Sequence, residues 1–271
     1  RPKTFDYNLI VIGAGSAGLV TSYIAAVVKS KVALIEKHRM GGDCLNTGCV
    51  PSKALIRSAK ILSYASRAEE FGLKKTAIDF EFKDVMNRVQ NVINKVEPHD
   101  SVERYTSLGV DCIDGEAKIT SPYSVEVNGR TLTTKSIVIA TGARPFVPPI
   151  PGLDKISYLT SNNIWNLKTL PKRLVVLGGG PIGSEMTQAF ARLGSNVTQV
   201  EMAPQIMGRE DPDVSAIIRK KFEAEGVRVL TDHTAKEIIV DNNTNILVCD
   251  NNGQKVDFEI DEFLGEMGRG G

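Results

Sequence analysis

Two stretches of the chain share one pattern of apolar and glycine positions. In the first, the apolar and mostly β-branched run at residues 9–12 leads into the sequence GAGSAG, and in the second, the apolar run after Arg173 leads into GGGPIG. A second apolar run of strand length follows each of them, at residues 31–35 and 196–200. An apolar run, a glycine turn, a segment of helix length and another apolar run together predict a βαβ unit. The chain is therefore expected to hold two copies of this unit.

The residues between the two copies predict helices followed by a hairpin. Residues 52–97 carry a long helical pattern with an interruption near Gly72. Residues 123–127 and 131–140 are predicted to be strands, and the Asn128-Gly129 dipeptide between them is typical of a tight hairpin turn.

An acidic residue ends the second apolar run of each copy at the same spacing. Glu36 lies eighteen positions after Gly18, and Glu201 lies eighteen positions after Gly183. In a dinucleotide-binding βαβ unit, the glycines permit a tight turn and let backbone N–H groups approach a pyrophosphate, while the acid accepts hydrogen bonds from a ribose. Either motif alone is weak evidence, but two with matching context and spacing predict two nucleotide sites.

The fold class that follows is α/β, with two Rossmann-like dinucleotide-binding domains. Four prolines between Pro145 and Pro151 indicate a stiff linker. We place the domain boundary there, which gives domains at residues 1–148 and 149–271.

Charge and length exclude several classes of protein. The 271 residues carry a formal net charge of +1, which offers no electrostatic footprint for nucleic acid and no polybasic membrane anchor. Residues 9–28 lack charge over a length that could cross a bilayer, but three glycines interrupt them, so we expect a strand, turn and helix instead. Four cysteines and no signal segment indicate a reducing cytoplasm, or the cytoplasmic face of a membrane if a segment was removed before Arg1.

Two of the cysteines, Cys44 and Cys49, lie in the glycine-rich sequence GGDCLNTGCVPSK. Cα atoms five positions apart in an ideal helix are about 8.6 Å apart, beyond the roughly 7 Å that a disulfide tolerates, so a bridge requires a distorted turn. Three interpretations remain: a zinc site, two buried reduced thiols, or a redox-active disulfide, and the position beside a nucleotide-binding acid favours the third. Cys112 and Cys249 lie in strand-like stretches and are expected to be core residues.

These motifs resemble those of the flavoprotein disulfide reductases, the class I pyridine nucleotide-disulfide oxidoreductases. The resemblance rests on both glycine motifs, the cysteine segment, the sequence ATGARP after residue 139, and Ser184-Glu185. Residues 40–53 and 99–104 look most like the branch that contains mercuric reductase, and dihydrolipoamide dehydrogenase belongs to the same family. The resemblance covers nearly the whole chain and implies an FAD domain with an NAD domain inserted into it.

The resemblance also assigns roles to residues. FAD is implied to bind the first domain, at Gly13, Gly15, Gly18, Glu36, Gly42, Lys53, Ala117, Thr141 and Gly142. The pyridine nucleotide is implied to bind the second, at Gly178, Gly180, Gly183 and Glu201. A carboxylate at Glu201 suits a free ribose 2′-hydroxyl and favours NADH over NADPH.

The implied activity is transfer of reducing equivalents from NADH, through the flavin, to a Cys44-Cys49 disulfide and on to a disulfide, dithiol or metal-ion substrate. Cys49 is implied to face the flavin and Cys44 to meet the substrate, and Lys53 is implied to pair with Glu185 beside the flavin. The alternatives are a flavin oxidoreductase, such as a transhydrogenase or quinone reductase, with idle thiols, and a nucleotide-binding redox sensor.

Parts of the family pattern are not found in this sequence. The sequence has no counterpart of the final flavin-binding strand, of the interface domain that makes the parent a homodimer, or of the acid/base pair in that domain. The sequence LGEMGR stands where the second domain of the family usually ends. We expect the C-terminal dimerisation domain to be absent and the chain as given to have low activity on its small-molecule substrate.

Overall fold

The structure is a computed structural model that describes residues 2–241 and 244–270, and it divides into two compact units. The first unit runs up to Pro51 and resumes over Gln90–Ala143, and the second comprises Ser52–Val89 and Arg144–Gly270. This division differs from the sequence-based one at residue 148, chiefly because it groups the helical segment after Pro51 with the second unit.

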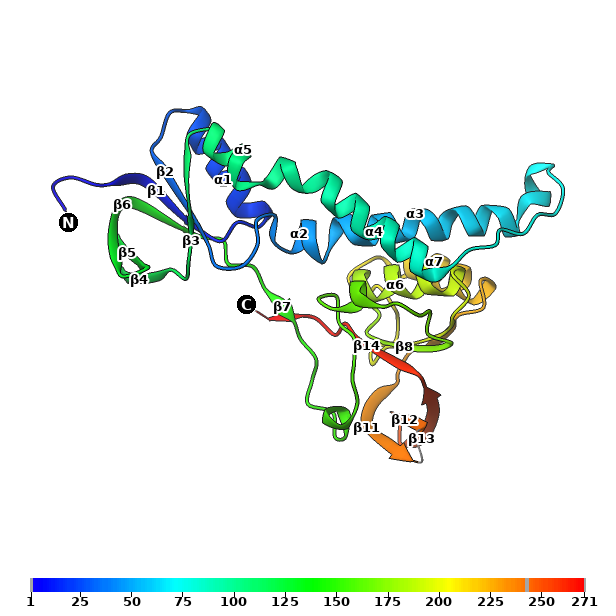
Figure 1. The fold of residues 1–271 in the computed structure, drawn as a ribbon. Helices are drawn as coiled ribbons and strands as arrows, with labels where there is room; N and C mark the ends of the chain where they lie inside the picture. The colour runs from blue at the N-terminus through cyan, green and yellow to red at the C-terminus, as the bar shows by residue number, and fades with distance from the viewer. Residues whose placement is uncertain (1, 242–243, 271) are drawn as a thin grey trace. The chain divides into compact units, whose positions relative to one another are not determined.

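The first unit is built on a six-stranded sheet with the order β3-β2-β1-β6-β5-β4 (Figure 1). Parallel pairing joins β1 to both β2 and β6, and β2 to β3, whereas β4 and β5 continue the sheet in the antiparallel sense. Helices α1 and α5 share one apolar core with one face of the parallel strands, and β5 and β6 close over the other face. The elements are β1 (Tyr7–Ile12), α1 (Ser16–Val27), β2 (Val32–Glu36), α5 (Val102–Ser107), β3 (Val110–Asp114), β4 (Lys118–Ser121), β5 (Ser124–Val127) and β6 (Arg130–Ile139).

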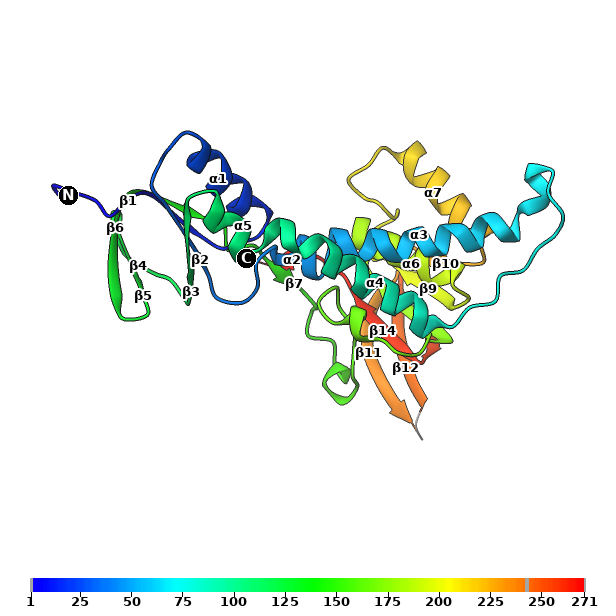
Figure 2. The ribbon, with the colours of Figure 1, turned by 45° about the horizontal axis from the view of Figure 1, so that its top comes forward.

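The second unit repeats this plan with a four-stranded parallel sheet of order β10-β9-β8-β14. Helices α6 and α7 lie next to the strands (Figure 2), and the three-stranded antiparallel sheet β11-β12-β13 packs its apolar side chains against β8, β9 and β14. The elements are β8 (Arg173–Leu177), α6 (Pro181–Arg192), β9 (Asn196–Val200), α7 (Pro212–Ala224), β10 (Arg228–Leu230), β11 (Thr234–Asp241), β12 (Thr244–Asn251), β13 (Gln254–Ile260) and β14 (Glu262–Gly265).

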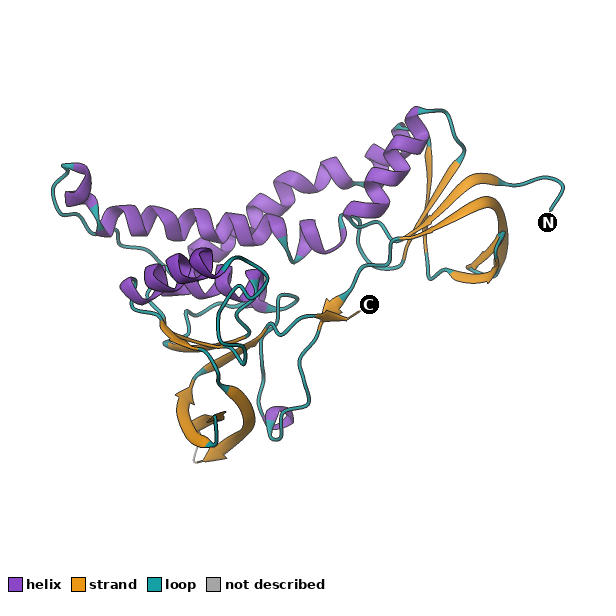
Figure 3. Cartoon of the chain, turned by 180° about the vertical axis from the view of Figure 1, so that it is seen from behind, coloured by secondary structure: helices purple, strands orange, loops and turns teal. Residues whose placement is uncertain are grey.

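Helical segments connect these sheets along the chain (Figure 3). They are α2 (Gly42–Asn46), α3 (Cys49–Ser66), η1 (Ala68–Phe71), α4 (Phe82–Val96), η2 (Glu97–Asp100), η3 (Leu153–Lys155) and η4 (Ile164–Asn166), and the short strands β7 (Arg144–Pro145) and β15 (Arg269–Gly270) pair with each other. The predicted interruption near Gly72 is longer than expected, because the chain is not helical again until Phe82. The predicted hairpin is confirmed: Asn128 and Gly129 have φ angles of 50° and 71°, and β5 pairs with β6 across them.

The uncharged stretch at residues 9–28 forms the end of β1, a turn and the twelve-residue helix α1, as predicted. No helix in the described part of the chain has both the length and the apolar character needed to span a membrane.

Candidate functional site

The first glycine motif brings backbone atoms together where no side chain would fit. A Cβ atom on Gly13, whose φ is +103°, would lie 2.3 Å from the carbonyl oxygen of Ala140, and one on Gly18 would lie 1.8 Å from the carbonyl oxygen of Gly13. Gly15 is the N-cap of α1, and a Cβ there would have only the Cα of Gly42 within 4 Å, at 3.8 Å. Two glycines therefore permit the tight turn, while the third leaves the helix N-terminus open to an anion.

The second motif has the same construction. A Cβ on Gly178, at φ +115°, would lie 2.3 Å from the carbonyl oxygen of Glu266, and one on Gly183 would lie 2.3 Å from the carbonyl oxygen of Gly178. Gly180 is the N-cap of α6, and a Cβ there would meet no atom within 4 Å. The φ and ψ angles of the two N-cap glycines agree closely, at −78° and −174° for Gly15 and −73° and −179° for Gly180.

Each predicted ribose-binding acid is tied to its own glycine motif. One carboxylate oxygen of Glu36 accepts the N–H of Ala14 at 2.6 Å, and one of Glu201 accepts the N–H of Gly179 at the same distance. The other oxygen of Glu201 accepts the N–H of Ala203 at 2.8 Å. A carboxylate has about four lone-pair directions, so each acid is fixed in orientation and still able to accept hydrogen bonds from a ribose.

We call each glycine motif with its acid a cradle: Gly13–Gly18 with Glu36 is the first, and Gly178–Gly183 with Glu201 is the second. The other residues predicted for the first nucleotide border the first cradle. Gly42, at φ +53°, lies so close to the motif that a Cβ would be 2.5 Å from the Cα of Gly15. Ala117 follows Gly115, whose N–H donates to the carbonyl of Glu36 at 2.9 Å. Thr141 and Gly142 are exposed just beyond β6, at the end of that strand where Ala140 bonds to β1. The shape and polarity of this part of the first unit fit an extended dinucleotide such as FAD.

The two cysteines lie on either side of a break between helices. Helix α2 ends at Asn46 and α3 begins at Cys49, and a Cβ on Gly48 would lie 2.9 Å from the carbonyl oxygen of Asp43. The predicted distorted turn is therefore present. Cys44 is partly buried, Cys49 is exposed, and no disulfide joins them in the structure.

The Cys44 thiol is held in its protonated form by its surroundings. Burial raises its pKa, and a hydrogen bond with Cys49 and the negative charge of Asp100 raise it further, whereas a hydrogen bond with Ser16 acts in the opposite direction. Burial also raises the pKa of Asp100 itself. An attacking thiolate at Cys44 therefore requires a base.

Lys53 and Glu185 form an ion pair within the second unit. The Lys53 Nζ atom lies 2.7 Å from each carboxylate oxygen of Glu185, so the lysine on α3 bridges to the first turns of α6. The structure brings together the two residues that the resemblance pairs, while their role beside a flavin stays a prediction.

A cavity of about 300 Å³ lies where the parallel strands of the second unit end. Leu177 ends β8, and Met202, His233 and Met267 follow β9, β10 and β14, so all four strands direct their carboxyl ends toward it. In open α/β sheets this edge is where ligands bind. The rest of the lining is Pro148, Pro149, Ile150, Pro151, Thr234, Ala235 and Lys236, so the proline segment predicted as a linker is also part of this wall.

Several residues beside these sites were not predicted. Ser16 and Asp100 influence Cys44, and Asp100 carried no sequence signal beyond its place in the segment at residues 99–104. Gln199 interrupts the apolar run of β9 at the position where Leu34 stands in β2, and aligning the two copies by their acids would have singled it out.

The chain is similar to known proteins both in sequence and in fold. Residues 7–269 match the family described as pyridine nucleotide-disulphide oxidoreductase. Mercuric reductase of Bacillus cereus is 35% identical over 98% of this chain and 42% of its own length, and dihydrolipoyl dehydrogenase of Acholeplasma laidlawii is 35% identical over 86% of this chain and 70% of its own. The solved structure of the HOCl-induced flavoprotein disulfide reductase RclA from Escherichia coli superimposes with a TM-score of 0.81, at 30% identity over 97% of this chain and 57% of that chain. The chain thus spans about half the length of most of these relatives.

Proposed function

The chain belongs to the pyridine nucleotide-disulphide oxidoreductase family, and from this membership we propose that it uses NADH and FAD to reduce a disulfide formed by Cys44 and Cys49. The observation that carries the proposal is the pair of matching glycine cradles, each with an acid bound to its glycine loop, together with a cysteine pair at the border of the first. In the net reaction, NADH, one solvent proton and the disulfide are converted to NAD⁺ and two thiols. The thiols then pass two electrons to a substrate, for which the relatives suggest a disulfide or a metal ion.

FAD is proposed for the first cradle. Gly13, Gly15 and Gly18 would hold its pyrophosphate, Glu36 its ribose, and the loop that carries Ala117 its adenine. When bound, FAD would supply a ring that accepts hydride from NADH and passes electrons to a disulfide. Lys53, whose Nζ atom lies 2.7 Å from a carboxylate oxygen of Glu185, is proposed to serve the flavin because family membership implies that role.

NADH is proposed for the second cradle, in preference to NADPH. Both carboxylate oxygens of Glu201 are held by backbone N–H groups, at 2.6 Å and 2.8 Å, so the acid cannot easily turn away from a ligand. A 2′-phosphate would meet this negative charge, whereas a free 2′-hydroxyl would donate to it. The cavity that begins at Met202, directly after Glu201, would receive the adenine. We expect NADH to bind at least about tenfold more tightly than NADPH. Placing the 2′-phosphate against the Glu201 carboxylate costs at least the free energy that corresponds to this ratio of dissociation constants.

The thiol chemistry requires a partner for Cys44. Burial and the neighbouring Asp100 keep this thiol protonated, so we propose that a second subunit of a homodimer supplies the base that activates it. This proposal predicts slow turnover wherever that base is missing.

The proposed function is tested by anaerobic reduction of the FAD-loaded protein with NADH, followed by addition of oxidised lipoamide or Hg²⁺. We expect Cys44→Ser and Cys49→Ser to abolish reduction of either substrate, while NADH still bleaches the flavin absorbance. Cys112→Ser serves as the control, because Cys112 lies in β3 and packs against the apolar core of the first unit, and it should retain full reduction.

Two outcomes would decide against the proposal. If Cys44→Ser reduced substrates as fast as the unaltered protein, the thiols would be idle and the chain would be a plain flavin oxidoreductase. If NADH neither bound nor bleached the flavin, the assignment of the second cradle would be wrong.

A further inference from the structure

One peptide group of the second glycine motif, the one that joins Gly178 to Gly179, is held at both ends: by a residue of strand β9 and by the residue that directly follows this strand. Its carbonyl oxygen accepts a hydrogen bond from the side-chain amide Nε2 of Gln199 at 3.2 Å. Its N–H donates to Glu201 at 2.6 Å. Gln199, which orients the peptide, and Glu201, which the peptide orients, therefore lie only two positions apart, at the end of β9 and directly after it.

The side chain of Gln199 does more than fill space in the core. It is completely buried, and its Nε2 also lies 3.2 Å from the hydroxyl of Ser184, which in turn donates to the carbonyl of Gly179 at 3.3 Å. Its carbonyl oxygen Oε1 is buried with no hydrogen-bond partner among the described residues. Burying an amide with an unsatisfied oxygen is unfavourable, so stability alone does not account for a glutamine here.

The first unit shows what the glutamine replaces. There, Leu34 stands at the position of Gln199, and Ala14 stands at the position of Gly179. The methyl group of Ala14 is buried in the apolar core together with Leu34, so packing fixes the orientation of the first motif. Gly179 has no side chain, and glycine on both sides of it allows the peptide to rotate at little steric cost.

We propose that Gln199 is a positioning residue of the pyridine-nucleotide site, which fixes the peptide between Gly178 and Gly179 so that its N–H holds the Glu201 carboxylate toward the adenosine ribose. This inference rests on the proposed binding of NADH to the second cradle. It predicts that loss of the amide weakens the binding of ligands that contain the adenosine ribose and leaves the fold intact.

The test compares Gln199→Leu, which copies the first unit, with the unaltered chain. Titration of nicotinamide fluorescence should show a dissociation constant for NADH about tenfold higher in the variant, the size expected for one lost orienting hydrogen bond. ADP-ribose, measured by calorimetry, should weaken by the same factor. Reduced nicotinamide mononucleotide, which lacks that ribose, should bind both proteins equally, a pattern that a general loss of structure would not produce.

Thr187→Val is the matched control, because Thr187 is another buried polar residue of the same unit and its hydroxyl has no hydrogen-bond partner among the described residues. Its NADH affinity should be unchanged. If Gln199→Leu fails to fold, Gln199→Met, which keeps the length and volume of the side chain, replaces it in every measurement.

The outcomes separate this inference from the proposed function. NADH affinity within twofold of the unaltered chain in a folded Gln199 variant overturns the inference and leaves the proposed function standing. Equal weakening of reduced nicotinamide mononucleotide and ADP-ribose also overturns it. Failure of the unaltered chain to bind NADH overturns the proposed function and this inference together.

Discussion

The two cradles have the same backbone and different supports. Both have a glycine N-cap, a carbonyl in contact with the third glycine, and an acid 2.6 Å from the second residue of the motif. Under that loop, the first cradle has Leu19 and Leu34 in an apolar core, whereas the second has Ser184 and Gln199 joined by a hydrogen bond. The backbone geometry is thus a requirement of the motif, and the side chains beneath it can be changed from apolar to polar.

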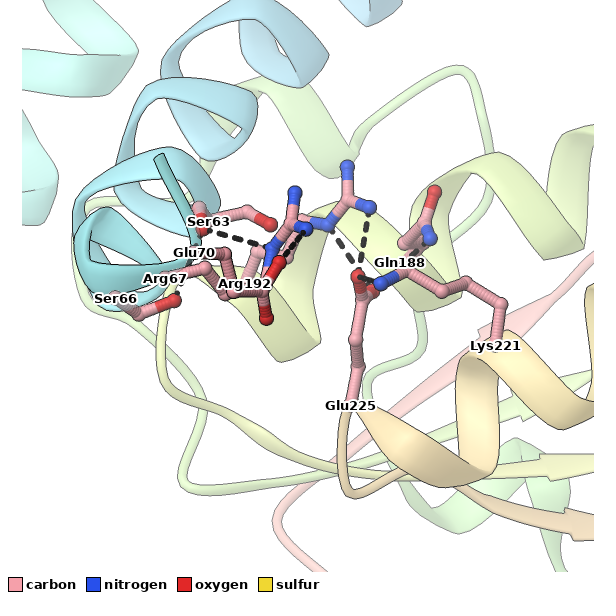
Figure 4. A network of polar contacts seen from close by, with 8 residues as sticks. All are labelled: Ser63, Ser66, Arg67, Glu70, Gln188, Arg192, Lys221 and Glu225. Atoms are coloured by element: carbon pink, nitrogen blue, oxygen red, sulfur yellow. Dashed lines mark hydrogen bonds and ion pairs between the residues drawn. The ribbon is translucent and has the colours of Figure 1, made fainter. Parts of the chain in front are cut away.

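The outer faces of the two cradle helices also differ, because α1 has apolar side chains where α6 has polar ones. On α1, Tyr23 and Val27 are exposed to solvent, and the equivalent positions on α6 are Gln188 and Arg192. Both of these α6 side chains bind Glu225 at the end of α7: Arg192 contacts its two carboxylate oxygens at 2.8 Å and 3.0 Å, and Gln188 contacts it at 2.9 Å (Figure 4). The cradle helix of the second unit is therefore held by a neighbouring helix through a polar network, whereas the first unit has exposed apolar side chains at these positions.

The largest effect is expected from filling the closest backbone contact of each cradle. Gly18→Ala and Gly183→Ala would place a Cβ 1.8 Å and 2.3 Å from a backbone carbonyl oxygen, which cannot move without opening the turn. Each should lower the free energy of unfolding by more than about 3 kcal/mol, with the greater loss for Gly18→Ala. Thermal unfolding followed by circular dichroism measures both.

Gly180→Ala is the control for that comparison, because a Cβ there meets nothing within 4 Å and the residue has a negative φ. It should change the melting temperature little. Equal stability of Gly18→Ala and Gly180→Ala would show that the close approach of Gly18 to the carbonyl oxygen of Gly13 does not exclude a side chain at residue 18.

The second-largest effect is expected in the polar network of the second unit, where Arg192 and Gln188 bind Glu225. Burial alone would raise the pKa of Glu225, but the hydrogen bonds and charge of Arg192, with Gln188 and Lys221, hold it below its usual value. Glu225→Ala leaves the largely buried Arg192 without its partner and should cost about 3 kcal/mol, as for other broken buried pairs. Chemical denaturation of the two proteins at pH 7 measures the difference.

The same pair predicts a pH dependence. Because the folded-state pKa of Glu225 lies below the unfolded-state value, its stabilising contribution is complete above the ordinary glutamate pKa and is lost as the pH falls through that value toward the folded one. The difference in stability between the unaltered chain and Glu225→Gln should therefore shrink as the pH falls below that range. A difference that stays constant down to about pH 3 would contradict this account.

A smaller effect is expected at Cys44 and Cys49. This pair follows the acid of the first cradle in the sequence, and no cysteine pair follows the acid of the second. Asp100→Asn removes a negative charge that raises the pKa of Cys44, so alkylation of this thiol by iodoacetamide at about pH 8 should become about two to three times faster, as for a modest pKa shift near the ambient pH. Mass spectrometry of the labelled peptide gives the rate. Labelling of Cys112, whose pKa is raised mainly by its own burial, is the internal control and should not change.

The elements and the glycine cradles could be predicted from the sequence because glycine spacing and apolar runs are local signals. The hairpin at Asn128-Gly129 and the ends of β2 and β9 follow from the identity of a few residues. The cavity could not be predicted in the same way, since Met202, His233 and Met267 come together only through the order of the strands. The influence of Asp100 on Cys44 likewise depends on how distant segments of one unit pack. Gln199 is a different case, because its position was readable from the alignment of the two copies and only its partners were not.

The smallest expected effect compares two hydroxyls at equivalent positions. Ser22 and Thr187 each lie seven residues after the N-cap glycine, are completely buried, and have no hydrogen-bond partner for their hydroxyl among the described residues. Removing an unsatisfied buried polar group is neutral or stabilising, so Ser22→Ala and Thr187→Val should each raise the free energy of unfolding by about 0.5–1 kcal/mol. Thr187→Val should gain more, because valine keeps the volume of threonine whereas Ser22→Ala leaves a small void. A loss of stability in either variant, measured by urea denaturation, would mean that the hydroxyl has a partner, such as buried water, that supports its cradle helix in that unit alone.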